Sequence, residues 1–169
     1  MRAWMVNELG HYRDKMKWGE CDRPAPKGTE ALIRVKAIGL NFPDILAIAG
    51  QYQVKAALPF IPGQEAMGDV VEIGPECDLR VGDRVMCMNQ GGAFAEFMIA
   101  PKQSRFLVPD VMTDADAAAF QMIYQTSYFG LAVRANIKPG EVLLVHGGAG
   151  GVGTSAIQLG KVMGAEVIA

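Results

Sequence analysis

The chain has 169 residues and a net charge of −2, and half of its residues are hydrophobic while 20% are charged. This composition supports a packed core, and it leaves no basic surface for nucleic acid or an anionic membrane. No apolar run reaches the roughly 18 residues that a membrane span requires, and three cysteines without a C-x-x-C pair argue against disulfides. We therefore expect a cytoplasmic protein that binds neither nucleic acid nor membranes.

The N-terminal part of the sequence predicts short strands separated by glycine and proline turns. Residues 31–38, ALIRVKAI, alternate apolar and polar side chains as a half-buried strand does. The only helical pattern among these strands lies at 43–49, so the segment predicts a partly open antiparallel barrel. The other expected strands are 2–6, 67–73, 84–88 and 93–99.

The composition changes after Asp110 toward a helical pattern. Thr113-x-x-Asp116 resembles a capping box, and an alanine-rich run with high helix propensity continues to about Ala135. Pro139-Gly140 then ends this connection and precedes an apolar strand. These features predict a helical segment between the barrel and a second structural unit.

The motif with the clearest chemistry is EVLLVHGGAGGVG at 141–153, an apolar strand followed by a glycine-rich turn that begins a helix. In a G-x-G-x-x-G turn the first glycine allows a tight turn, the second lets backbone N–H groups approach a pyrophosphate, and the third lets the helix pack closely. The positive end of the helix dipole then faces the anion. The expected cofactor-binding residues are Gly148, Ala149, Gly150, Gly151, Val152 and Gly153.

The helix that follows the turn has an apolar face suited to packing on a sheet. Gly164 ends this helix and allows a second parallel strand at 165–169. The expected packing face consists of Val152, Ala156, Leu159, Gly160 and Met163.

In this order and spacing, the motifs resemble the medium-chain dehydrogenase/reductase superfamily, in its zinc-free quinone oxidoreductase branch, which includes zeta-crystallin. The resemblance implies an α/β protein that covers only the N-terminal portion of such an enzyme. It implies a chaperonin-10-like catalytic barrel at 1–123 and the first βαβ unit of an incomplete Rossmann domain at 124–169. The motifs are GLNFPD at 39–44, GQY at 50–52, PGQE at 62–65, VGDRV at 81–85, GAFAE at 92–96, QTSY at 125–128 and the glycine-rich turn.

The sequence departs from the zinc-dependent members of this superfamily. Those members have a histidine where Gln64 stands and a cysteine near the position of Asn41, so the ligands of a catalytic zinc are missing here. We expect no metal site and hydride transfer without zinc. The resemblance implies NADPH as the cofactor, as in this branch generally. The residue that binds the ribose, and so distinguishes NAD from NADP, belongs just beyond Ala169, so NAD is not excluded.

Four side chains are candidates for work at the active site. Asn41 can orient the nicotinamide carboxamide or a substrate carbonyl, or it can simply cap the following helix. Asp44 can transfer a proton, cap the helix or pair with a cation. Tyr52 can donate to the substrate oxygen or serve as an aromatic anchor of its loop. Thr126 can contact the cofactor near the nicotinamide or bond back within its own helix.

The resemblance implies an NADPH-dependent oxidoreductase that transfers hydride to a small quinone or an α,β-unsaturated carbonyl. An enoyl-thioester reductase of the same superfamily is the alternative. A rival of another class is a noncatalytic fragment or binding module that lacks a complete cofactor site. We expect the full-length protein to form a homo-oligomer, and the 169-residue chain alone to be inactive.

Overall fold

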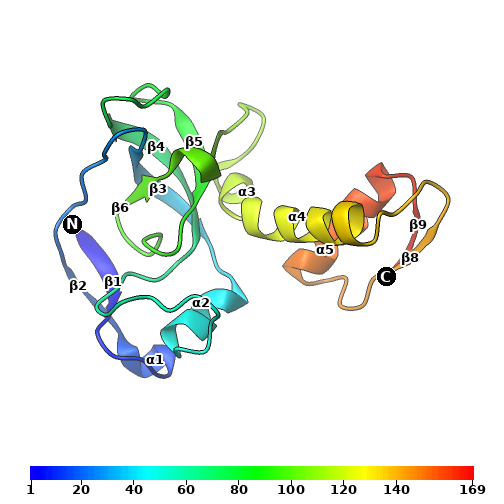
Figure 1. Cartoon of the computed structure of the whole chain (residues 1–169), viewed down its shortest axis with the longest axis horizontal. Coiled ribbons are helices and arrows are strands. Elements are labelled where there is room, and N and C mark those ends of the chain that lie inside the picture. The colour runs from blue at the N-terminus through cyan, green and yellow to red at the C-terminus, as the bar shows by residue number, and fades with distance from the viewer. The chain divides into compact units, whose positions relative to one another are not determined.

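The computed structural model describes all residues, Met1–Ala169. Their contacts divide the chain into two compact units, Met1–Ala119 and Phe120–Ala169. The labels in Figure 1 mark β1 to β6 in the first unit, and α4, α5, β8 and β9 in the second. The functional boundary expected between residues 123 and 124 stays a prediction.

The first unit is built on an antiparallel sheet of five strands in the order β6-β3-β4-β5-β7. A separate antiparallel pair, β1 with β2, connects through two isolated bridges to the segments before β6 and β4, from Ala3 to Ala95 and from Val6 to Phe60. This arrangement confirms the expected antiparallel barrel. Its elements are β1 (Arg2–Val6), α1 (Tyr12–Lys15), β2 (Met16–Glu20), β3 (Ala31–Gly39), α2 (Phe42–Ile48), β4 (Glu65–Ile73), β5 (Arg84–Met88), β6 (Phe97–Ala100), the 3₁₀ turn Lys102–Ser104, β7 (Arg105–Leu107) and α3 (Asp114–Ala118).

The predicted strand at 31–38 forms β3, which pairs with β4 on one side and β6 on the other. Its side chains alternate in exposure only from Arg34 onward, because Ala31, Leu32 and Ile33 are all buried. Helix α3 packs against β3 and β4 and therefore covers part of the sheet. The core of this unit includes Ala31, Ile33, Ala66, Val70, Val85, Cys87, Ala93, Phe94, Met98 and Ala100.

The strand expected at 93–99 is shorter and shifted, because β6 begins only at Phe97. The N–H groups of Ala93 and Phe94 instead donate to the carbonyl oxygens of Gly63 and Pro62, at 3.1 and 3.0 Å. These residues therefore bond to the loop before β4 and not to β3. Strands β2 and β7 were not predicted, since MKWGE and RFL carry little alternation.

The alanine-rich run forms separate helices where the sequence predicts one continuous segment. The expected cap is confirmed, since Thr113 Oγ1 accepts a hydrogen bond from the Asp116 N–H at 3.1 Å. Helix α3 ends at Ala118, and Ala119 leaves the helical conformation with φ −99° and ψ 10°. The chain resumes as α4 (Gln121–Tyr128) and continues as a π-helical segment (Phe129–Arg134), where the Ala135 N–H donates to the Gly130 carbonyl.

The second unit contains the predicted βαβ arrangement. Strands β8 (Val142–Leu144) and β9 (Glu166–Ile168) pair in parallel, and α5 (Gly151–Val162) connects them. The expected packing face of α5 is wrong at Val152, which is 47% exposed. Gly153, Ser155 and Gly160 are the buried positions of the helix. Because Gly160 has no side chain, α5 lies close to Leu143 of β8 at this position.

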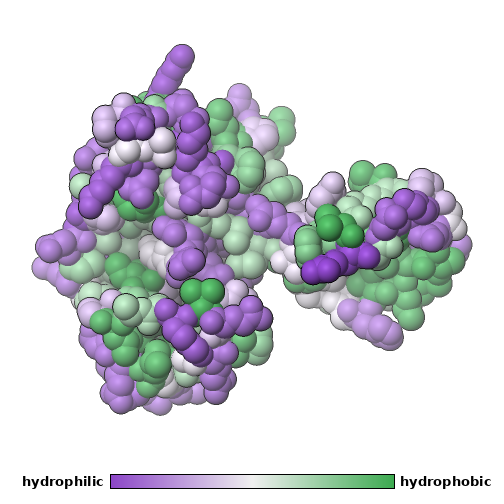
Figure 2. Space-filling view, in the orientation of Figure 1, coloured by the Kyte–Doolittle hydropathy of each residue, from purple (hydrophilic) through white to green (hydrophobic).

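Hydrophobic surface is visible on the second unit in Figure 2. Its exposed apolar side chains include Val142 and Leu144 of β8 and Ile168 of β9. The pair of parallel strands therefore keeps apolar surface accessible within the described chain. No helix in the chain is both long enough and apolar enough to cross a membrane.

Candidate active site

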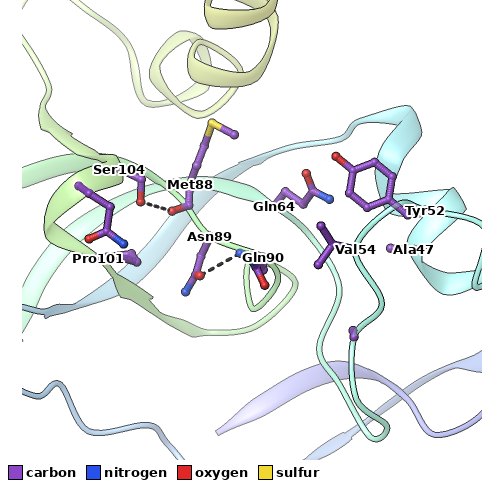
Figure 3. Close-up of a pocket in the computed structure, with 11 residues that line it drawn as sticks. Ala47, Tyr52, Val54, Gln64, Met88, Asn89, Gln90, Pro101 and Ser104 are labelled. Carbon is purple, nitrogen blue, oxygen red and sulfur yellow. Dashed lines mark hydrogen bonds between the residues drawn. The ribbon is translucent and has the colours of Figure 1, made fainter.

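The first unit contains a cavity of about 410 Å³ beside Tyr52 and Gln64 (Figure 3). Its polar groups are carboxamides and hydroxyls, and no charged side chain belongs to its lining. The cavity can therefore hold a small uncharged molecule and hydrogen-bond to its oxygens. The lining residues are Ala47, Tyr52, Val54, Ala56, Gln64, Met88, Asn89, Gln90, Pro101, Gln103 and Ser104.

The end of α2 positions Tyr52. The N–H groups of Gln51 and Tyr52 both donate to the carbonyl oxygen of Leu46, at 2.8 and 3.1 Å, which folds the chain back over the last turn of the helix. Tyr52 is half-buried and lines the cavity from this loop. Tyr52 thus lines the cavity, and its catalytic role stays a prediction.

The opposite part of the cavity is formed where β4 begins and β5 ends. Gln64 precedes β4 and is buried, and its carbonyl oxygen accepts from the Asn89 N–H at 2.9 Å. Ser104 Oγ donates to the carbonyl oxygen of Met88 at 2.6 Å. Hydrogen bonds to backbone carbonyl oxygens therefore fix the side chain of Ser104 and the backbones of Gln64 and Asn89. Asn89 had no signal in the sequence, because it belongs to none of the recognised motifs.

Asn41 and Asp44 lie at the start of α2. Asn41 is the N-cap residue, and its backbone N–H donates to Asp44 Oδ2 at 2.8 Å. Its side-chain Nδ2 donates to Oε1 of Glu65 at 2.7 Å. Neither Asn41 nor Asp44 belongs to the cavity lining, but Glu65 follows Gln64, which does. The structure therefore joins two of the sequence motifs, 39–44 and 62–65, at one corner of the barrel.

Two carboxyl groups are buried at this corner, since Asp44 is 3% exposed and Glu65 is 2% exposed. Burial is the main cause that raises the pKa of Asp44 to about 6; the nearby charge of Glu65 acts in the same direction, while the backbone N–H groups of Asn41 and Gln64 oppose the change. Asp44 Oδ1 makes no hydrogen bond. Asp44 therefore exchanges its proton near neutral pH, as a general acid or base must.

The structure brings together no group of three or more His, Cys, Asp or Glu side chains that could hold a metal ion. Burial also raises the pKa of Cys87 to about 12, which disfavours the thiolate that a metal requires. Zinc independence remains a prediction that rests on Gln64 and Asn41 at the positions of zinc ligands.

The glycine-rich turn joins β8 to α5 in the second unit. The left-handed residue of this turn is Gly147, with φ +71°, which lies one position before the first glycine of the expected motif. Gly153 is buried against the turn, and a Cβ atom there would lie 2.2 Å from the Gly147 carbonyl oxygen. The close packing expected of the third glycine is therefore present. The residue with the left-handed backbone conformation in this turn is Gly147 and not Gly148.

The first turn of α5 has two features of an anion site. Gly150 is the N-cap residue and has no side chain, and residues 149–152 are exposed. Accessible backbone N–H groups at the N-terminus of a twelve-residue helix form a suitable anion site. Thr126 is exposed, and its hydroxyl donates back to the Met122 carbonyl at 2.6 Å. The structure thus shows the helix-bonded alternative for Thr126, while its contact with a cofactor is untested.

Comparison with known proteins identifies the architecture. Residues 27–110 match the alcohol dehydrogenase GroES-like domain. The chain is 39% identical over 161 residues to the human synaptic vesicle membrane protein VAT-1 homolog, covering 94% of this chain and 41% of that protein. It is 38% identical over 173 residues to the quinone oxidoreductase-like protein 2 homolog of Nematostella vectensis, covering 99% of this chain and 46% of that protein.

A solved structure gives the same result. The fold matches the quinone oxidoreductase of Thermus thermophilus, which was determined alone and with NADPH, with a TM-score of 0.86 and 34% identity over 99% of this chain and 52% of that chain. The chain belongs to the quinone oxidoreductase branch of the medium-chain dehydrogenase/reductase superfamily. This confirms the resemblance inferred from the motifs. The chain spans about half the length of these relatives.

Proposed function

We propose that the full-length protein carrying this chain is an NADPH-dependent, zinc-independent oxidoreductase that reduces a quinone or an α,β-unsaturated carbonyl. The observation that carries the proposal is the uncharged cavity lined by Tyr52 and Gln64, in a chain that also contains a glycine-rich helix N-terminus. The NADPH complex of the Thermus thermophilus relative supports this choice of cofactor.

The glycine-rich turn provides the cofactor-binding part of the proposal. Residues 148–153 would line the pyrophosphate site at the N-terminus of α5. The Gly150 N–H donates to the Gly147 carbonyl at 3.0 Å, so the N–H groups of the residues that follow it in the first turn would face the phosphates. When bound, NADPH supplies the hydride. Small side chains in the turn leave the backbone accessible, and Gly153 allows α5 to pack against it. Thr126 would add a contact toward the nicotinamide end.

The acceptor would lie in the cavity of the first unit. Reduction of a carbonyl-conjugated acceptor places negative charge on its oxygen, and hydrogen-bond donors fixed in a dry site stabilise that charge. Tyr52 would donate its phenolic O–H from the cavity lining. Asn41, which lies outside this lining at the start of α2, would donate an N–H of its carboxamide to the part of the acceptor that reaches that corner of the barrel. Asp44 would exchange a proton with solvent or product, as its pKa of about 6 permits.

The cavity favours a small neutral acceptor over a carrier-bound thioester. The lining contains carboxamides, hydroxyls and apolar groups, and it contains no lysine or arginine that would pair with the phosphates of a carrier. This supports a quinone or enone as the substrate and makes the enoyl-thioester reductase the second choice. A cytoplasmic location and a homo-oligomeric state are further predictions for the full-length protein.

The proposal can be tested by following NADPH oxidation by the full-length protein with a small quinone and, separately, with a crotonyl thioester. We expect turnover with the quinone and a kcat/KM at least about tenfold lower with the thioester, which corresponds to about 1.4 kcal/mol in transition-state stabilisation. A preference for the thioester would support the second choice. Absence of NADPH oxidation with both compounds, in a sample of correct intact mass, would favour the noncatalytic binding module.

A further inference from the structure

The carboxamide of Asn41 is oriented by a buried carboxylate. Its Nδ2 atom lies 2.7 Å from Oε1 of Glu65, which is 2% exposed. An ionised carboxylate only accepts hydrogen bonds, so the nitrogen end of the amide must face it. In the flipped orientation, Oδ1 would meet a carboxylate oxygen and both would lack a proton. The bond to a buried charge is also stronger than a neutral one.

Glu65 is held by the centre of the sheet. It begins β4, where it pairs with Gly39 of β3 on one side and with Met88 of β5 on the other. Its side chain lies directly over Gly39, since a Cβ atom on that glycine would be 2.1 Å from Oε1. The carboxylate therefore has little freedom to follow a movement of Asn41.

The backbone of Asn41 is fixed independently. Its N–H donates to Asp44 Oδ2 at 2.8 Å, at the N-terminus of α2. Asp44 thus holds the backbone of Asn41 while Glu65 holds its side chain. Two separate contacts leave the residue one backbone position and one amide orientation. One of the two N–H bonds of Nδ2 is used by Glu65, and the other is left as a donor.

We propose that Glu65 is a positioning residue, which keeps the Asn41 amide in the orientation that presents an N–H donor to the oxygen of a bound carbonyl. This inference rests on the proposed function, in which Asn41 contacts the acceptor. The adjoining Gln64 lines the cavity, so the Gln64-Glu65 pair connects the buried carboxylate to the acceptor site. Without the carboxylate, the amide can rotate and present its oxygen, which repels a carbonyl.

Nuclear magnetic resonance of the ¹⁵N-labelled 169-residue chain tests the positioning without requiring activity. The side-chain NH₂ signals of Asn41 are assigned by their loss in Asn41→Ser. We expect one of these protons to exchange with water about ten- to a hundredfold more slowly than those of the exposed Asn7, as a hydrogen bond to a charged group predicts. In Glu65→Gln the acceptor is uncharged and the new amide can also donate, so we expect this protection to weaken.

Glu72→Gln is the matched control, because Glu72 lies on the same strand and is exposed, pairing with Arg23 at 3.1 Å. We expect it to leave the Asn41 signals unchanged. Equal protection of Asn41 in wild type and in folded Glu65→Gln would overturn the proposal. If Glu65→Gln does not fold, the wild-type spectrum decides, since Asn41 protons that exchange as fast as those of Asn7 would also overturn it.

A double-mutant cycle in the full-length enzyme tests the consequence for catalysis. We expect Glu65→Gln to lower turnover about tenfold or more with little change in the KM for NADPH, and to have no further effect when Asn41 is already serine. Independent, multiplicative effects of the two substitutions would contradict positioning through Asn41. If the wild-type enzyme reduces no acceptor, the proposed function fails, and the resonance measurements alone support or overturn the orientation of Asn41.

Discussion

The hydroxyl oxygens of Ser127 and Ser155 lie 2.6 Å apart where α4 packs against α5. Ser155 is fully buried, and its Oγ also lies 3.0 Å from the carbonyl oxygens of both Ile123 and Val152. Ser127 Oγ lies 2.9 Å from the same Val152 carbonyl. The two serines therefore connect α4 to the first turn of α5, which carries the proposed pyrophosphate site.

Removal of the Ser155 hydroxyl is expected to loosen this connection. Ser155→Ala removes the hydrogen bond to the part-buried carbonyl of Ile123 and the contact with the Ser127 hydroxyl, at about 0.5 to 1.5 kcal/mol for each hydrogen bond. Hydrogen exchange of the α4 and α5 amides in the 169-residue chain measures the effect, and we expect faster exchange in both helices. Ser104→Ala removes a hydroxyl of the first unit and should leave it unchanged. Unchanged exchange in Ser155→Ala would show that apolar packing alone joins α4 to α5.

Gly153 is expected to be necessary for the pyrophosphate turn. In Gly153→Ala the new methyl group would lie 2.2 Å from the Gly147 carbonyl oxygen, so the backbone of the turn must move. We expect NADPH binding by the full-length protein to weaken by at least about tenfold, which corresponds to about 1.4 kcal/mol. Calorimetric titration measures this directly.

Gly151→Ala is the matched control for that measurement. Its methyl group would meet the Cγ2 atom of Ile123 at 3.0 Å, and this side chain can adjust by a small rotation. We expect a much smaller loss of affinity than for Gly153→Ala. Equal losses for both substitutions would show that the first turn of α5 tolerates no side chain, and that packing against Gly147 is not the cause.

The sequence predicts the fold where a local pattern also determines the contact. The Thr113 cap, the close packing of Gly153 and the alternation of β3 from Arg34 onward each depend on neighbours in the chain, and these parts of the prediction are found in the structure. Local patterns fail where a distant partner decides the outcome. Val152 has the right helical spacing for burial, yet Gly153 and Ser155 form the packed face because the turn and α4 lie against them.

The candidate site was predictable only in part for the same reason. Tyr52 and Gln64 belong to separate motifs, and nothing in either segment indicates that they line one cavity. The bond from Asn41 to Glu65 connects residues 24 positions apart, so it depends on the pairing of β3 with β4. The raised pKa of Asp44 results from burial, which its position in the first turn of a short helix does not reveal.

Tyr52 is expected to act on the acceptor and not on the cofactor. Tyr52→Phe keeps the ring that lines the cavity and removes one hydrogen bond to developing charge, so we expect turnover of the full-length enzyme to fall about ten- to a thousandfold. The dissociation constant for NADPH should change little. Steady-state kinetics and titration measure both quantities, with Tyr12→Phe as a control in α1. Unchanged turnover would leave Tyr52 as an aromatic anchor of its loop.

Asp44 is expected to make the first unit less stable as pH rises. Burial favours its neutral form, so the folded protein retains a proton that the unfolded chain releases at lower pH. Between pH 3.8 and about 6 unfolding therefore releases a proton, and the free energy of unfolding decreases with pH. Above pH 6 the accumulated cost is at most about 3 kcal/mol.

Asp44→Asn removes this cost, because the amide is uncharged and its oxygen can still accept from the Asn41 N–H. We expect little difference from wild type at pH 4 and a higher urea midpoint for the variant at pH 7.5. Fluorescence of Trp4 and Trp18, both in the first unit, follows this transition. Asp114→Asn is the control in which the change in stability has the opposite sign. The hydrogen bond from Arg84 lowers the pKa of Asp114, so loss of that charge should destabilise the protein at neutral pH. A stability difference between Asp44→Asn and wild type that is the same at pH 4 and pH 7.5 would contradict the raised pKa, because it would mean that Asp44 is already ionised at pH 4. The hydrogen bond from the Asn41 N–H would then stabilise the carboxylate more strongly than burial destabilises it.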